Sequence, residues 1–257
     1  VFTESDTAYA DRWIASIVVL TLTLVSFGPI LWNQFVEWDD YENYLSNVNY
    51  RGLGWAQLSW MFTTVHMGPY QPLSWVTLGL DYLIWGMNPT GYHLTSLLFH
   101  AANAVFFYFI SRRMLVILWP QAPNQARWKL STAAAFAALF FSVHPLRVES
   151  VAWATERRDV VSGFFFLATV YCYLRANTNL DSQSRGWFAA ALTCYILSLL
   201  GKATAITLPI VLLILDIFPL RRLDGDPRTW WAIPSGEILR EKLLFVLPAI
   251  LFAIVAF

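Results

Sequence analysis

The chain has 257 residues, of which 57% are hydrophobic, 17% are aromatic and only 13% are charged. Soluble domains carry about 25% charged residues, so this composition excludes an ordinary water-soluble domain and indicates a membrane protein. The 17 basic and 17 acidic residues cancel, which excludes a global electrostatic field that would attract nucleic acid.

The first apolar segment, residues 13–32, has the length of a membrane span. About 20 apolar residues in a helix cross a hydrocarbon core of roughly 30 Å, and a helix satisfies its own backbone there. The segment lacks the small-residue cleavage pattern of a signal peptide, so we interpret it as a retained span. Residues 1–12 are then a cytoplasmic N-terminal segment.

Residues 33–92 are expected to form a large non-cytoplasmic loop. It opens with WDDYENY, which puts the carboxylates of Asp39 and Asp40 directly after the first span, at the membrane–water boundary. Two aromatic-rich stretches, LGWAQLSWMF and LSWVTLGLDYLIW, favour helices that lie in the interface with tryptophans at headgroup depth. An ordinary aromatic belt is the alternative interpretation.

Six more apolar runs follow, at residues 94–110, 130–143, 160–174, 187–200, 203–215 and 243–257. With the first segment they predict an all-α membrane domain of about seven spans over residues 13–257. Several runs are short enough to suit buried core helices instead. Residues 221–242 are interpreted as a solvated cytoplasmic linker. We expect the chain to be the N-terminal part of a longer fold.

The distribution of basic residues predicts the orientation of these spans. With a cytoplasmic N-terminus, the loops on that side hold twelve of the 17 basic residues: Arg12, Arg112, Arg113, Arg127, Lys129, Arg175, Arg185, Arg221, Arg222, Arg228, Arg240 and Lys242. Because the bias of Lys and Arg sets orientation, Asp39 and Asp40 are predicted to face a periplasm or an organelle lumen. A bacterial inner membrane is preferred over the endoplasmic reticulum.

Polar residues of three distant segments fall on that outer side. The first loop contributes Glu37, Asp39, Asp40 and Glu42, the segment HPLRVESVAWATERRD contributes His144, Arg147, Glu149, Glu156, Arg157, Arg158 and Asp159, and the turn GKAT contributes Lys202. A carboxylate can take a proton from an incoming hydroxyl, and Arg or Lys can hold a phosphate. This set of residues would suit displacement of a phosphate leaving group.

Simpler interpretations exist for the same residues. The second outer segment also fits a short interfacial helix in which Glu149, Trp153 and Arg157 lie four apart and ion pairs hold the face together. Lys202 also fits a lysine at a helix end whose side chain extends to place its ammonium group in water. Asp216, near the cytoplasmic end of its run, is interpreted as structural.

The interior of the spans carries few polar groups. His93, His100 and Asn103 can share one helix face, and hydrogen bonds between helices explain them better than metal ligation. Cys172 and Cys194 lie within apolar runs and are interpreted as small buried hydrophobic residues. No HExxH or CxxC spacing occurs, so the sequence does not support a divalent metal and identifies no cofactor, and metal dependence stays open.

Four segments resemble a known family in order. They are FVEWDDYENYL, YQPLSWVTLGLDYLIWGMNPTGYHLTSLLFHAANAVFFYF, HPLRVESVAWATERRDVVSG and LSLLGKATAITLPIVLLILDI, within residues 32–220. They are similar to the membrane half of the transmembrane and TPR-repeat-containing O-mannosyltransferases and their bacterial relatives, which are C-type (GT-C) glycosyltransferases.

The resemblance implies a GT-C-like helical bundle that moves a sugar from polyprenyl or dolichyl phosphate to a hydroxyl, often of a Ser or Thr side chain. Mannose is a candidate sugar. Asp39 would be the catalytic base, with Asp40 as the neighbour that positions it or takes the role itself. The donor phosphate would be held by Arg147, Arg157, Arg158 and Lys202, and the donor or acceptor would be positioned by His144, Glu149 and Asp159.

Expected partners are membrane lipid, the lipid-phosphate sugar and a protein acceptor, and in-line attack would invert the anomeric carbon. Two alternatives stay open: a structural subunit of a membrane complex built on the same fold, and a transporter of a lipid-linked substrate. A transporter should bury charges in the middle of its spans, whereas here almost all charges fall at helix ends.

Overall fold

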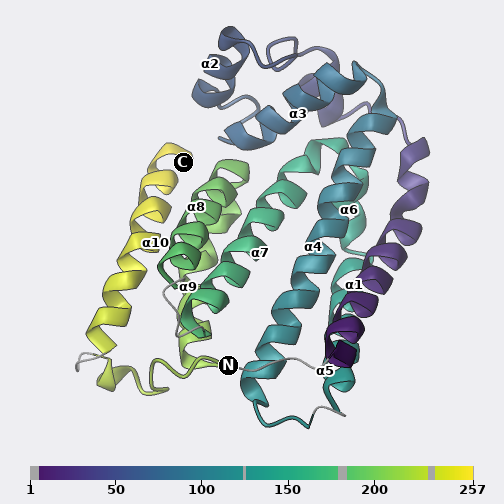
Figure 1. The fold of residues 1–257 in the computed structure, drawn as a ribbon. Coiled ribbons are helices and arrows are strands. Elements are labelled where there is room, and N and C mark those ends of the chain that lie inside the picture. The colour runs from purple at the N-terminus through teal and green to yellow at the C-terminus, as the bar shows by residue number, and fades with distance from the viewer. Residues whose placement is uncertain (1–5, 124–125, 179–183, 231–234, 257) are drawn as a thin grey trace.

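The computed structural model describes residues 6–123, 126–178, 184–230 and 235–256. Most of these residues are helical, and none of them belongs to a strand. The long helices run side by side, and two shorter ones cross one end of the bundle (Figure 1). The bundle consists of α1 (Asp6–Phe27), α4 (Pro89–Leu118), α5 (Arg127–Ser142), α7 (Arg157–Thr178), α8 (Ser184–Gly201), α9 (Leu208–Ile217) and α10 (Ser235–Ala256).

Three stretches of helix are long and apolar enough to cross a membrane: Ala10–Trp32, Pro89–Leu118 and Ala154–Thr178. They contain the predicted runs at 13–32, 94–110 and 160–174, and they indicate an integral membrane protein. The other four predicted runs are also helical, but their described residues do not meet this length and apolarity. The count of seven spans therefore stays a prediction.

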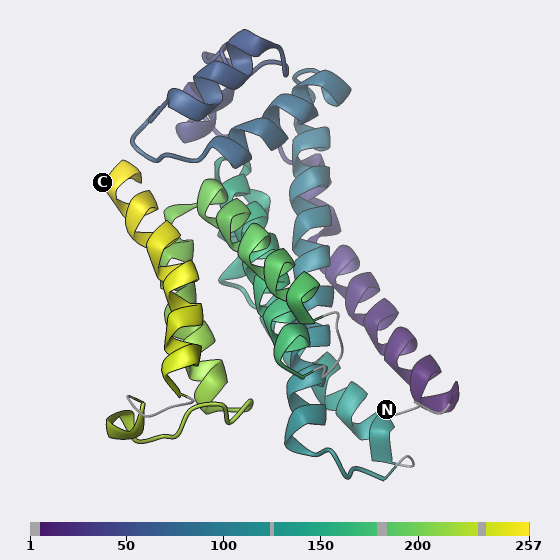
Figure 2. The ribbon, with the colours of Figure 1, turned by 60° about the vertical axis from the view of Figure 1, so that its left-hand side comes forward.

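The two ends of the bundle differ in what the chain places there. We call the end crossed by α2 (Trp55–Thr63) and α3 (Pro72–Trp85) the outer end, and the opposite end the basic end (Figures 1 and 2). Helices α4, α7 and α9 begin toward the outer end and run toward the basic end. Consequently the first loop, the start of α7 and the turn at Lys202 share the outer end.

The first loop packs on the outer end through aromatic side chains. Tyr44, Tyr50, Trp75 and Tyr92 are almost completely buried in one cluster. A Cβ atom on Gly79 would lie 2.7 Å from the carbonyl oxygen of Gly52, so the contact of α3 with this backbone admits only glycine. Trp55 at the start of α2 remains 86% exposed, as an interfacial tryptophan would be.

The second outer segment is not the single helix that its pattern favours. Helix α6 (Arg147–Ala152) ends at Trp153, whose backbone is extended (φ −93°, ψ 119°), and the 3₁₀ turn η4 (Ala154–Glu156) leads into α7. Because the helix is interrupted, Glu149 and Arg157 share no face. The interpretation as one helix held together by their ion pairs is therefore wrong.

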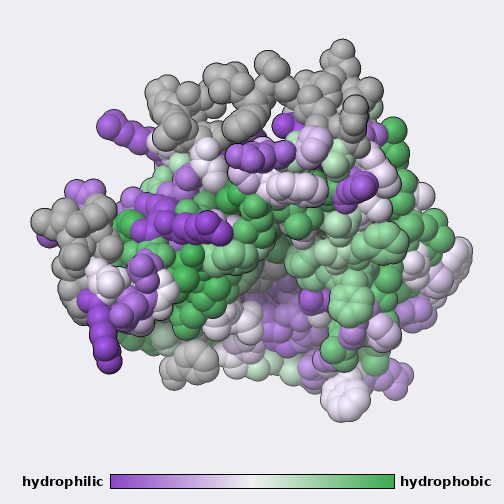
Figure 3. Space-filling view, turned by 90° about the horizontal axis from the view of Figure 1, so that it is seen from below, coloured by the Kyte–Doolittle hydropathy of each residue, from purple (hydrophilic) through white to green (hydrophobic). Residues whose placement is uncertain are grey.

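The basic end is closed by ion pairs around Asp216. Its buried carboxylate accepts two hydrogen bonds from the Tyr173 hydroxyl at 2.9 and 2.8 Å, and it pairs with Arg222 at 3.0 Å and with Lys242. Asp216 thus has the structural role predicted for it, and both ends of the 221–242 segment fold back onto the bundle. Residues 231–234 of that segment lie outside the described residues. Figure 3, a view of this end, shows hydrophilic side chains over it with hydrophobic ones between them.

Candidate active site

Asp40 joins the first loop to the turn that precedes α7. Its carboxylate accepts hydrogen bonds from the backbone N–H of Val36 (3.0 Å), from the backbone N–H of Thr155 (2.9 Å) and from the Thr155 hydroxyl (2.6 Å). Its exposure is 0%. A buried carboxylate with three donors already has the partners it needs. This placement argues against Asp40 as the group that takes a proton from a substrate.

Asp39 has the opposite surroundings. It is partly exposed, and no described residue forms a hydrogen bond or an ion pair with its carboxylate. Neighbouring Cα atoms are about 3.8 Å apart, so the bonds of Asp40 hold Asp39 within one residue of the Thr155 contact. Of the two predicted carboxylates, Asp39 is the one that remains available to accept a proton.

Acidic and basic side chains from α7 and the 202 turn meet at the outer end. Lys202 Nζ lies 3.0 Å from Glu156 Oε2 and also pairs with Asp159, and Arg158 Nε donates to Glu156 Oε1 at 3.1 Å. Lys202 is therefore held in ion pairs rather than merely extended toward water. The structure thus brings three of the predicted site residues, Arg158, Asp159 and Lys202, into one cluster.

Arg157 lies apart from that cluster, inside the protein. Its exposure is 0%, and it lies 2.8 Å from both Asp81 Oδ2 and the Ser96 hydroxyl and donates to the Tyr92 carbonyl. Burial raises the pKa of Asp81, and the charge of Arg157 opposes that rise. Because Arg157 is enclosed between α3, α4 and α7, its position argues against contact with a donor phosphate.

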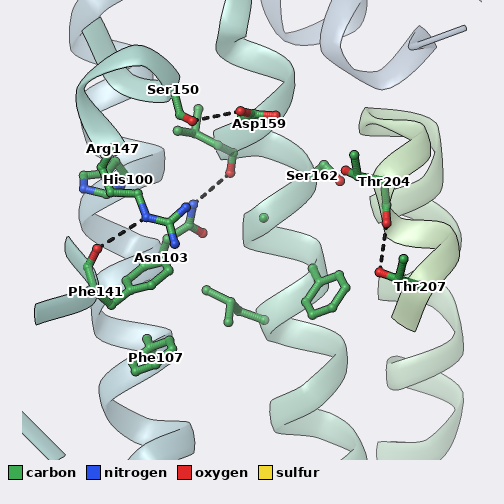
Figure 4. Close-up of a pocket in the computed structure, with 14 residues that line it drawn as sticks. His100, Asn103, Phe107, Phe141, Arg147, Ser150, Asp159, Ser162, Thr204 and Thr207 are labelled. Atoms are coloured by element: carbon green, nitrogen blue, oxygen red, sulfur yellow. Dashed lines mark hydrogen bonds between the residues drawn. The ribbon is translucent and has the colours of Figure 1, made fainter. Parts of the chain in front are cut away.

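A cavity of about 520 Å³ opens between α4, the end of α5, α6, the first half of α7 and the 3₁₀ turn η5 (Ala203–Thr207). Figure 4 shows its polar and aromatic parts: Ser150 and Asp159 lie at one end, Phe107 lies at the other, and Arg147 and Asn103 lie between them. Phe141, Phe166 and Leu167 add to the apolar lining. The cavity is therefore amphipathic along its length.

Arg147 is the cation in this cavity. Its guanidinium lies over the ring of Phe141 at 4.2 Å, and its Nε donates to the Phe141 carbonyl at 3.4 Å. No carboxylate of the described residues lies within ion-pair distance of it. Burial lowers the pKa of Arg147, partly offset by Asp159, yet an arginine stays charged at neutral pH. Its charge is thus available to an anion in the cavity.

Two predicted positioning residues lie outside the cavity lining. His144 Nδ1 accepts the Leu146 N–H at 3.2 Å and its ring contacts Phe140. Glu149 is exposed, and its carboxylate has no partner among the described residues. Asp159, the third, does line the cavity and accepts the Ser150 hydroxyl at 2.8 Å. The structure therefore separates Asp159 from the other two.

His100 and Asn103 line the cavity as well, which the sequence does not predict. They make the expected hydrogen bonds between helices, His100 Nε2 with the Ser142 carbonyl at 2.9 Å and Asn103 Nδ2 with the Val160 carbonyl at 3.0 Å. Their shared face on an apolar helix was the only signal available, and it does not distinguish a packed interface from a cavity wall.

Comparison with known proteins gives relatives named protein O-mannosyl-transferase. The chain is 30% identical to the mouse and human proteins named protein O-mannosyl-transferase TMTC2 over 169 residues, which is 64% of this chain and 19% of theirs. It is 25% identical to human protein O-mannosyl-transferase TMTC4 over 223 residues, which is 82% of this chain and 30% of that protein. The chain thus spans about a fifth of the length of the TMTC2 relatives.

No protein-family model matches the chain, and no solved structure matches it. The curated relatives nevertheless agree with the resemblance carried by the four motif segments. Over 64% of its length, therefore, this chain is similar at 30% identity to proteins named protein O-mannosyl-transferase.

Proposed function

We propose that the chain is the membrane part of a glycosyltransferase that moves a sugar from a polyprenyl- or dolichyl-phosphate donor to a hydroxyl of a protein. The observation that carries the proposal is the amphipathic cavity, in which the unpaired cation Arg147 lies between a polar end and an aromatic end. The names of the relatives support mannose as the sugar and protein as the acceptor. Serine or threonine would supply the hydroxyl.

The two parts of such a donor match the two parts of the cavity. The phosphate would lie against Arg147, whose guanidinium can make paired hydrogen bonds to phosphate oxygens. The isoprenoid chain would lie along Phe107, Phe141 and Phe166, where each buried CH₂ contributes about 0.8 kcal/mol. Arg158 and Lys202 would bind the phosphate at the rim of the cavity after releasing their carboxylate partners.

The proposed reaction is an in-line displacement in which Asp39 is the base and Arg147 stabilises the leaving phosphate. The acceptor oxygen attacks the anomeric carbon while its proton passes to Asp39, and the bond between that carbon and the phosphate oxygen breaks. The lipid phosphate leaves with the bonding electrons toward Arg147, and attack from the opposite side inverts the anomeric centre. Asp40 would hold the Asp39 backbone in place. His144 and Glu149, on the outer surface, would act on the acceptor side.

The same proposal covers the fold and its orientation. The chain would form a C-type glycosyltransferase bundle of about seven spans, and its active face would point away from the cytoplasm. The position of the ion pairs favours a transferase over a transporter, because those of the described residues lie toward the two ends of the bundle rather than at its middle.

The test compares three carboxylate variants for transfer from a polyprenyl-phosphate sugar and for thermal unfolding. Asp39→Asn should lower transfer by about 10² to 10⁴ with little change in unfolding, because it removes a base and no contact. Asp40→Asn should lower the unfolding temperature, since an amide nitrogen would then face the Val36 N–H, which now donates to Asp40 Oδ2. Glu37→Gln, an exposed carboxylate two residues away, is the control and should change neither. Full transfer by Asp39→Asn would remove Asp39 from the mechanism.

A further inference from the structure

Asn103 of α4 presents a side-chain amide whose orientation is fixed. The residue is only 4% exposed, and its Nδ2 donates to the Val160 carbonyl at 3.0 Å. Exchange of the amide nitrogen and oxygen would put Oδ1 against that carbonyl oxygen, and two acceptors repel each other. The nitrogen therefore faces α7, and the oxygen must face elsewhere.

The Asn103 oxygen is a buried acceptor without a partner. No described residue donates to Oδ1, although the atom is shielded from bulk solvent. Asn103 lines the same cavity as Arg147, and in Figure 4 its oxygen points away from the Val160 carbonyl. A buried polar atom that lacks a hydrogen bond is costly, so this position favours a ligand that supplies a donor.

Gly163 of α7 lies beside this amide in the wall of the cavity. A Cβ atom on Gly163 would come within 3.4 Å of Asn103 Nδ2, and no other atom would lie within 4 Å apart from Asn103 Cγ. Gly163 thus leaves room beside the nitrogen of the amide. Thr204 and Thr207, from η5, add hydroxyl groups to the wall of the same cavity.

We infer that Asn103 Oδ1 accepts a hydrogen bond from a hydroxyl group of the donor's sugar, and that Asn103 thereby distinguishes sugar-loaded lipid phosphate from bare lipid phosphate. The inference rests on the proposed function. Among the three parts of such a donor, the phosphate oxygens only accept hydrogen bonds at neutral pH and the isoprenoid chain has no polar hydrogen. Only the sugar hydroxyls can satisfy this oxygen.

The experiment measures binding of polyprenyl phosphate with and without its sugar to the purified protein. Asn103→Ala should weaken binding of the sugar-loaded lipid on the order of tenfold and leave binding of bare polyprenyl phosphate unchanged. Arg147→Gln should weaken both lipids by the same factor, because both carry the phosphate.

A second measurement leaves the protein unchanged, so it does not depend on how a variant folds. Among donors that each lack one sugar hydroxyl, one should bind the wild-type protein about tenfold more weakly and should lose nothing further in Asn103→Ala. Equal weakening of sugar-loaded and bare lipid by Asn103→Ala would overturn the inference while the proposed function stands. Binding of neither lipid to the wild-type protein would overturn both.

Discussion

At the scale of single residues, two adjacent arginines illustrate how much of the site depends on the fold. Arg157 is enclosed with Asp81, whereas Arg158 is partly exposed and pairs with Glu156. Both partners are charged, yet only the enclosed pair excludes water. The contribution of an ion pair to stability depends on whether water reaches it. The sequence alone does not distinguish the two arginines in this respect.

Arg157→Gln should therefore lower the free energy of unfolding by about 3–5 kcal/mol, because it leaves the Asp81 carboxylate buried and unpaired. Arg158→Gln, the matched control in the next position, should cost about 1 kcal/mol or less. The measurement is denaturant or thermal unfolding of the purified protein. The double variant Asp81→Asn with Arg157→Gln should recover part of the loss. Equal losses in the two single variants would contradict this account.

The sequence also predicts which residues lie at the outer end but not which of them touch. Lys202 contacts Glu156 and Asp159 across more than 40 positions of the chain. Such contacts depend on how α7 and α8 pack, and no local pattern encodes that packing. Asp39 and Asp40 are likewise equivalent in sequence, and the hydrogen bonds from Val36 and Thr155 alone distinguish them.

At the scale of elements, the apolar runs predict the bundle helices well, because burial in lipid or protein demands apolar residues over a whole helix. The break at Trp153 has no such signal, since no Gly or Pro marks it. It is stabilised by tertiary contacts of the turn that follows: Tyr44 donates to the Ala154 carbonyl at 2.7 Å, and Thr155 donates to Asp40. Docking of the first loop thus determines where α7 begins.

Helix α7 also offers a direct test of the cavity. Gly163→Leu places a side chain into it and should reduce sugar transfer on the order of 100-fold, because the donor would be displaced from its reactive position. Stability should not fall, since leucine favours helix over glycine.

Gly186→Leu on α8 is the control for this variant. A Cβ atom there meets no other atom within 4 Å, and the position does not line the cavity. Transfer should stay at the wild-type level. Both variants are assayed with the same polyprenyl-phosphate donor and unfolded by heat. A Gly163→Leu protein with full transfer would show that the donor binds elsewhere.

At the scale of the whole molecule, the charge pattern and the bundle agree with each other. The segments rich in Lys and Arg fall at the basic end, and Asp39 and Lys202 fall at the other. Orientation can be predicted because it depends on summed charge rather than on packing. The position of the layer formed by α2 and α3 cannot be predicted from the sequence, because it depends on close contacts such as that of Gly79 with the backbone of Gly52.

Labelling of single cysteines tests this orientation. In a chain whose free Cys172 and Cys194 are replaced by alanine, Glu37→Cys should react with a membrane-impermeant maleimide in intact cells, and Arg185→Cys should react only after the membrane is opened. Both positions are exposed, so only the membrane determines whether the maleimide reaches each cysteine. The reverse labelling pattern would place the carboxylates of the first loop in the cytoplasm.

The enclosed position of Arg157 has a consequence for biogenesis. Its three partners, Asp81, Tyr92 and Ser96, all precede it in the chain. A ribosome makes the N-terminal part of a protein first, so α3 and α4 emerge before the guanidinium that they receive. The fully buried charge of Arg157 is thus synthesised after its acceptors, so its counter-ion, Asp81, is already present when it enters the bilayer.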